Sequence, residues 1–145
     1  MEGRIMSTRG TAFFEIQESP SSKPGIVGRI GIPRDGYPKG FGYEICAIIS
    51  SVRIDSCTES PIEQQLKQHC YRNVDRAVLH ILYKYPSDYF FEDEYVYRFI
   101  IAPYKTENTS YRLEEVMHVE VKHNRRRKEF DGSFGEFRIF CDRSD

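Results

Sequence analysis

The sequence predicts an α+β fold in which a curved antiparallel sheet of about six strands, in the order βββαβββ, packs on one long helix. Three observations support this prediction. Apolar and polar residues alternate in several short segments, which is typical of half-buried strands. One long segment instead repeats its apolar residues every three or four positions, the spacing of a helix. The links between the strands are short and rich in turn formers, which favours antiparallel hairpins over parallel crossovers.

Three strands are expected before the helix. The first covers residues 11–17 and ends at a stretch of Ser and Pro residues, where the prolines lack backbone N–H donors. The second covers residues 25–32 and is followed by a loop rich in Pro and Gly. The third covers residues 41–54 and carries apolar residues on both faces, which indicates a central strand or one bent by a bulge.

The long helix is expected over about residues 60–85. Ser60 is followed by Pro61 and, three positions after the serine, by Glu63, and this arrangement predicts a capping box at the first turn. Pro86 ends the helix, because the residue before a proline avoids helical geometry. The apolar face is formed by Ile62, Leu66, Cys70, Val74, Ala77, Val78, Ile81 and Leu82.

Three more strands are expected after the helix. Residues 95–101 alternate in the manner of a strand, and Pro103 follows them. The next strand runs from Glu114 to Lys122, with Met117, Val119 and Val121 facing inward and His118, Glu120 and Lys122 facing outward. The last strand begins at Phe134.

Composition limits the class of protein. Hydrophobic residues make up 39% of the 145 residues and charged residues 30%, so a folded core is expected. We expect a flexible leader over residues 1–9 and a single domain over 10–145. No apolar run approaches the ~20 residues that a membrane span needs, and the N-terminus has no apolar core of a signal peptide. The expectation is an intracellular protein of the cytoplasm or nucleus without a membrane partner.

The four cysteines and the absence of catalytic motifs argue against several chemistries. Cys46, Cys57, Cys70 and Cys141 contain no C-x-x-C pair, so free and mostly buried thiols are expected. No phosphate-binding glycine loop and no nucleophile motif occurs. We therefore expect neither a cofactor nor a resident metal, and a binding protein is favoured over an enzyme.

A basic cluster is the strongest candidate binding element. The 21 Lys and Arg against 22 Asp and Glu leave a net charge of −1, so any affinity for nucleic acid must be local. Arginine and lysine clustered in one turn bind phosphate oxygens and displace counterions. The alternatives are a solvated hairpin balanced by Glu129 and Asp131, or a targeting or docking signal. The cluster occupies the predicted hairpin between the fifth and sixth strands and contains Lys122, Arg125, Arg126, Arg127 and Lys128.

An aromatic pattern on the fourth strand suggests a second binding element. Tyr95 and Tyr97 alternate along the strand with Arg98 after them, which can form a stacking platform for unpaired bases. The same alternation is typical of a strand that packs against a helix. The face that meets the helix decides between these interpretations.

Three functions are consistent with these patterns. The leading hypothesis is a small non-enzymatic protein that binds RNA or single-stranded DNA, as a regulatory or viral accessory factor. The first alternative is a protein-interaction module or homodimer that uses edge strands and the aromatic loop 88–94. The second is a metal-dependent nuclease, in which Glu120 of Glu120-Val121-Lys122 holds Mg²⁺ together with a carboxylate from a neighbouring strand. Asp88, Asp93 and Glu94 are the candidates for that carboxylate.

Overall fold

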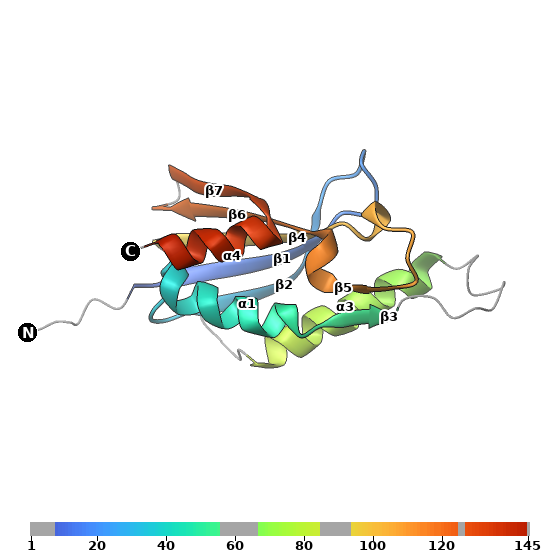
Figure 1. The fold of residues 1–145 in the computed structure, drawn as a ribbon, viewed down its shortest axis with the longest axis horizontal. Coiled ribbons are helices and arrows are strands. Elements are labelled where there is room, and N and C mark those ends of the chain that lie inside the picture. The colour runs from blue at the N-terminus through green and yellow to red at the C-terminus, as the bar shows by residue number, and fades with distance from the viewer. Residues whose placement is uncertain (1–7, 56–66, 85–93, 125–126, 145) are drawn as a thin grey trace, which may run out of the picture.

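The computed structural model describes residues 8–55, 67–84, 94–124 and 127–144. Five of its strands form a mixed sheet in the order β2-β1-β4-β6-β7 (Figure 1). Their bounds are β1 Gly10–Ile16, β2 Gly25–Ile32, β4 Tyr95–Ile101, β6 Met117–His123 and β7 Arg127–Ser133. Two short strands, β3 (Arg53–Asp55) and β5 (Ser110–Arg112), form a separate pair. The predicted α+β class is confirmed, but the predicted set of strands is not.

One strand pair departs from the predicted antiparallel arrangement. β1 and β4 are parallel, from Gly10 opposite Tyr95 to Ile16 opposite Ile101, whereas the other pairs of this sheet are antiparallel. A parallel pair requires a crossover connection, and the described part of the chain between β1 and β4 includes the helices α1 (Tyr43–Ser50) and α3 (Lys67–Lys84). The prediction of an entirely antiparallel sheet was wrong here. It assumed that strands consecutive in sequence are neighbours in the sheet, whereas β1 lies beside β4.

The segment 41–54, predicted to be a strand, is mostly helical. A π-helical turn, η1 (Pro38–Gly42), leads into α1 (Tyr43–Ser50), and only β3 is extended. The buried residues Phe41, Ile45 and Ile49 recur every four positions, which places them on one face of a helix. Gly42 lets this helix approach the C-terminal helix α4 (Phe134–Arg143), since a Cβ atom there would lie 2.5 Å from the Sγ atom of Cys141.

The last predicted strand is also a helix. α4 covers Phe134–Arg143, and β7 occupies the seven residues before it. The Ser133 hydroxyl accepts a hydrogen bond from the Glu136 N–H at 3.2 Å, and the Glu136 carboxylate accepts one from the Ser133 N–H at 2.9 Å. This reciprocal capping box fixes the first turn of the helix. Phe134, Phe137 and Cys141 are buried at helical spacing.

The long central helix is confirmed over the residues that the structure describes. α3 covers Lys67–Lys84, and the predicted capping box at Ser60 and Glu63 and the predicted end at Pro86 lie outside the described residues. Val74, Val78 and Ile81 are buried. Gly28 of β2 allows a close approach, because a Cβ atom there would meet Leu82 at 2.6 Å.

The fifth predicted strand begins later than expected. A 3₁₀ turn, η3 (Leu113–Val116), takes its first residues, and a second such turn, η2 (Pro103–Lys105), follows β4. β6 then keeps the predicted alternation, because Met117, Val119 and Val121 are buried and the residues between them are not. The inward and outward faces of this strand were therefore predicted correctly.

The helices cover one face of the sheet. α4 packs on β6 and β7, α1 lies beside α4, and α3 runs along β2 (Figure 1). Phe99 packs on Phe14 with ring centroids 5.0 Å apart, and Phe137 of α4 stands edge-on to Phe99 at 5.7 Å. The aromatic face of β4 is therefore the core face, and it meets α4 rather than the long helix. No element of the described ranges covers the opposite face, which we call the open face.

Two of the four cysteines can be placed. Cys46 of α1 and Cys141 of α4 are free and buried, as predicted. A hydrogen bond between the two thiols and their burial raise the pKa of Cys141. Cys57 and the side chain of Cys70 lie outside the described residues.

Two residues of the predicted leader, Thr8 and Arg9, form hydrogen bonds with the fold. The carbonyl oxygen of Thr8 accepts a hydrogen bond from the Gly36 N–H at 2.8 Å, and that of Arg9 accepts one from the Tyr95 N–H at 3.2 Å. Both residues thus belong to the fold, and residues 1–7 lie outside the described residues. Within the described ranges, no helix has the length and apolar character needed to cross a bilayer.

Candidate nucleic-acid interface

The basic cluster lies on the hairpin that joins β6 to β7. His123 is paired with Arg127, and Lys122 with Lys128. Asn124 at the turn has a φ of 54°, in the left-handed region that asparagine tolerates better than most residues. Arg125 and Arg126 lie outside the described residues. The predicted hairpin is confirmed for the other three cations, although its second strand begins seven residues earlier than expected.

The described cations of the hairpin are largely exposed, and they differ in how closely they are paired. The Arg127 side chain is 79% exposed and lies 3.9 Å from Glu129. Lys122 lies 4.0 Å from Glu120, and Lys128 lies 3.1 Å from Asp131. Exposed pairs of this kind contribute at most about 1 kcal/mol.

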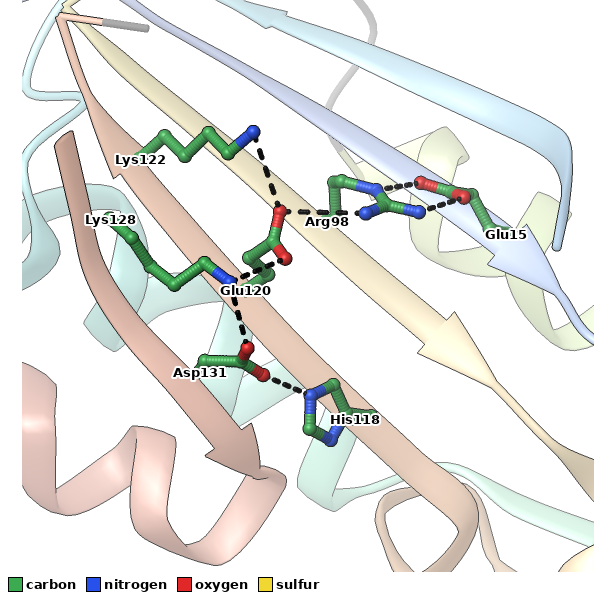
Figure 2. Close-up of polar contacts among 7 residues, drawn as sticks. All are labelled: Glu15, Arg98, His118, Glu120, Lys122, Lys128 and Asp131. Atoms are coloured by element: carbon green, nitrogen blue, oxygen red, sulfur yellow. Dashed lines mark hydrogen bonds and ion pairs between the residues drawn. The ribbon is translucent and has the colours of Figure 1, made fainter. Parts of the chain in front are cut away.

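A chain of alternating charges crosses the open face beside the hairpin. Figure 2 shows it running from Glu15 through Arg98, Glu120, Lys128 and Asp131 to His118. Arg98 makes the strongest contact, since its guanidinium donates to both oxygens of the buried Glu15 carboxylate at 2.7 and 2.8 Å. We call this set of residues the charge network.

The titration behaviour of the network follows from these contacts. The hydrogen bonds to Glu15 raise the pKa of Arg98 above its already high value. Hydrogen bonds from His118 and Lys128 lower the pKa of Asp131, and the Asp131 contact raises the pKa of Lys128. The network is therefore a set of ion pairs that is nearly balanced in charge.

The predicted stacking platform is not formed. Tyr97 is buried in the core, where its hydroxyl donates to the Gly36 carbonyl at 2.6 Å and burial raises its pKa. Arg98 points to the open face and is held by Glu15. The reason is the two-residue period of a strand, which puts neighbouring residues on opposite faces. Neither side chain is placed to stack on a base in this structure.

Tyr95 has a partner that the sequence analysis missed. Its ring stacks on His123 with centroids 4.4 Å apart and planes 10° apart, at the base of the basic hairpin. His123 Nδ1 lies 3.4 Å from Glu129, and Nε2 lies 3.8 Å from Glu94. Partial burial, with Glu129 and Glu94 nearby, raises the pKa of Tyr95. Neighbouring residues of a strand point to opposite faces, so the alternation of β6 predicts that His123 lies on the face opposite to Lys122.

The structure also tests the geometry of the nuclease hypothesis. Asp131 of β7 lies directly opposite Glu120, so a second carboxylate does stand on a neighbouring strand. Asp131 was not among the predicted candidates, of which Glu94 lies near His123. Asp88 and Asp93 lie outside the described residues. Arg98, Lys122 and Lys128 already surround Glu120, whereas Mg²⁺ sites need uncompensated oxygen ligands. Among the described residues, no group of three potential metal ligands occurs.

Comparisons with protein-family models, with curated proteins and with solved structures find no match to this chain.

The Asp131 contacts lead to a testable pH dependence. His118 and Lys128 lower the pKa of Asp131 in the folded protein below its usual 3.8. These contacts therefore stabilise the fold at pH values above 3.8, and the stabilisation is lost as the pH falls through the lowered pKa of the folded protein. We expect His118→Ala to shift the Asp131 titration, followed by carbon NMR of the carboxyl group, upward toward 3.8. An unchanged titration in His118→Ala would show that the two side chains do not interact in solution.

Proposed function

We propose that the chain is a non-enzymatic protein that binds single-stranded RNA or DNA through the β6–β7 hairpin. The observation that supports this is the exposure of the hairpin cations at the outer edge of the sheet, where the Arg127 side chain is 79% exposed and those of Lys122 and Lys128 are about half exposed. Arginine forks and lysine ammonium groups in such a turn reach phosphate oxygens without moving any core residue. Lys122, Arg125, Arg126, Arg127 and Lys128 are the proposed phosphate contacts.

The base of the hairpin favours a single strand over a duplex. Tyr95 and His123 stack there, and both side chains are partly exposed. Planar side chains of this kind hold unstacked bases, which a single strand offers and a duplex does not. Tyr95 thus stays in the proposed interface, whereas the buried Tyr97 and the paired Arg98 leave it. The net charge of −1 gives little long-range attraction, so we expect modest affinity.

The proposal is tested by the salt dependence of binding. Fluorescence anisotropy with labelled oligouridine and oligothymidine, repeated at several salt concentrations, gives the slope of log K against log salt. Each lost phosphate contact reduces the magnitude of that negative slope by about 0.7 for a single strand. The triple substitution R125A/R126A/R127A is therefore expected to make the slope shallower by about 2. A labelled duplex serves as the competing ligand class and is expected to bind more weakly.

A matched control separates the hairpin from general electrostatics. The triple substitution R76A/K84A/R143A also removes three exposed positive charges, but from α3 and α4. We expect it to leave the slope nearly unchanged. If both triple variants shift the slope equally, or if the native chain binds no single strand up to tens of micromolar, the hairpin is not a nucleic-acid interface. Strands shortened after addition of Mg²⁺ would instead support the nuclease hypothesis.

A further inference from the structure

Two buried thiols meet where α1 packs beside α4. The two helices lie side by side on the same face of the sheet (Figure 1). The Tyr43 hydroxyl of α1 donates a hydrogen bond to the Asp142 carboxylate of α4 at 2.8 Å. Cys46 lies about one turn after Tyr43, and Cys141 lies directly before Asp142. Both cysteines are free and belong to the hydrophobic core.

Gly42 brings the two sulfur atoms over the same turn of α1. A Cβ atom on Gly42 would lie 2.5 Å from the Sγ atom of Cys141, so that sulfur lies directly against the Gly42 backbone. Cys46 comes four positions later, and helical side chains lean toward the preceding turn, which here contains Gly42. The side chain of Cys46 thus points to the place that the Cys141 thiol occupies. The hydrogen bond between the two thiols, which raises the pKa of Cys141, agrees with this contact.

Cys46 is the thiol that a reagent in solution meets first. It lines a hollow of about 590 Å³ between α1 and α4, together with Ser50 and Ile139. Cys46 is 7% exposed, whereas Cys141 is fully buried and does not line the hollow. The thiolate is the reactive form of cysteine, and the raised pKa of Cys141 keeps its thiol protonated at neutral pH. Oxidation is therefore expected to begin at Cys46.

We propose that Cys46 and Cys141 form a redox-sensitive pair, which hydrogen peroxide converts to a disulfide bond between α1 and α4. In the first step the Cys46 sulfur attacks a peroxide oxygen and the O–O bond breaks. The hydroxide that leaves takes the Cys46 proton and becomes water, and Cys46 becomes a sulfenic acid. In the second step the Cys141 sulfur attacks the Cys46 sulfur, the S–O bond breaks, and the hydroxide leaves as water with the Cys141 proton. The two thiols are oxidised by two electrons, and the peroxide is reduced to two molecules of water.

The disulfide joins parts of the chain that are far apart in sequence. The strands β4 and β6 lie between the two cysteines, so the bond closes a long loop and restricts the unfolded chain. The oxidised chain is therefore expected to unfold at a higher urea concentration than the reduced chain. The pair lies in the helical layer, on the face of the sheet opposite to the charge network, and the inference does not depend on the proposed function.

Peptide mapping of the native chain tests the proposal. Trypsin places each of the four cysteines on a different peptide, with Cys46 on 40–53 and Cys141 on 139–143. The folded chain is treated with hydrogen peroxide, its remaining thiols are alkylated, and it is digested without reductant. We expect peptide 40–53 linked to 139–143, about 2 Da lighter than the sum of the two, and its loss on reduction.

Oxidation in concentrated urea is the control for the fold. The unfolded chain is expected to give a mixture of cysteine pairings, whereas the folded chain gives the Cys46–Cys141 link. The proposal is overturned if the folded chain yields the same mixture, if its links join other cysteines, or if Cys46 is oxidised while Cys141 stays a free thiol. It is also overturned if neither cysteine reacts.

Three variants test the order of the two steps and the geometry. Cys141→Ser is expected to leave a sulfenic acid on Cys46, which a 1,3-diketone probe traps, and to abolish the rise in the urea midpoint. Cys46→Ser is expected to leave Cys141 as a free thiol, because that thiol is fully buried. In C46S/S50C the new thiol lines the same hollow one turn farther from Gly42, so no link to Cys141 is expected. An equal yield of the link in C46S/S50C would contradict the contact over Gly42. Circular dichroism checks the fold of each variant.

Discussion

Replacing Phe137 with alanine is expected to lower the free energy of unfolding by about 3–5 kcal/mol, the usual cost of removing a buried aromatic ring. Phe137 is fully buried and joins α4 to the sheet. Its ring stands edge-on to Tyr97 at 6.2 Å and to Phe99 at 5.7 Å, and it also packs on Phe130 of β7 at 5.8 Å. Urea denaturation followed by circular dichroism measures the loss.

Ile139 provides the comparison on the same helix. It lies two residues after Phe137 and is more than half exposed, so Ile139→Ala is expected to change the free energy of unfolding by no more than about 0.5 kcal/mol. If the two substitutions cost the same, α4 does not cover the sheet as described here. The pair therefore tests the helix that the sequence pattern misassigned as a strand.

The misassigned helices have a common physical cause. Residues four positions apart share one face of a helix, but because four is an even number they also share one face of a strand. Phe41, Ile45 and Ile49 of the α1 region satisfy both patterns, and so do Phe137 and Cys141 of α4. Helices of eight and ten residues contain too few repeats to separate the two periods. α3 is long enough to do so, and its described residues, Lys67–Lys84, lie within the predicted helix.

Local capping signals carried more information than the alternation. Ser133 and Glu136 form a capping box of the kind predicted at Ser60 and Glu63, and Phe134 breaks the even spacing of α4. Reading that box as a helix start would have placed α4 correctly and left residues 127–133 free to form β7. The parallel pairing of β1 with β4 had no such signal, because it depends on the path of the chain across the helices.

The candidate site was predicted only in part, because a sequence gives the faces of one strand but not the partners of that strand. The outward row of His118, Glu120 and Lys122 follows from the two-residue period alone. The partners of that row come from other strands, and a single sequence does not give the register between strands. Asp131 faces Glu120 across β6 and β7, while Glu15 reaches Arg98 from 83 residues away. The basic hairpin was predictable because all of its residues are adjacent in sequence.

Arg98→Met is expected to destabilise the fold by about 3 kcal/mol at neutral pH, because it leaves the Glu15 carboxylate buried without a cation. Arg98 donates to both oxygens of Glu15, and Glu120 lies 3.4 Å away on its other side. Methionine keeps the aliphatic stem of the side chain, so most of the loss reflects the missing charge. Urea denaturation at several pH values measures it.

Two further measurements separate a stranded charge from lost packing. In Arg98→Met the loss should shrink as the pH falls toward about 4, because protonation of a buried and unpaired carboxylate removes the unfavourable charge. The double substitution R98M/E15M should recover most of the stability, since an apolar pair of similar volume often replaces a buried ion pair without cost. A loss that is independent of pH and persists in R98M/E15M would mean that Arg98 acts through packing of its stem. The Glu15 contact would then be a consequence of the fold rather than one of its causes.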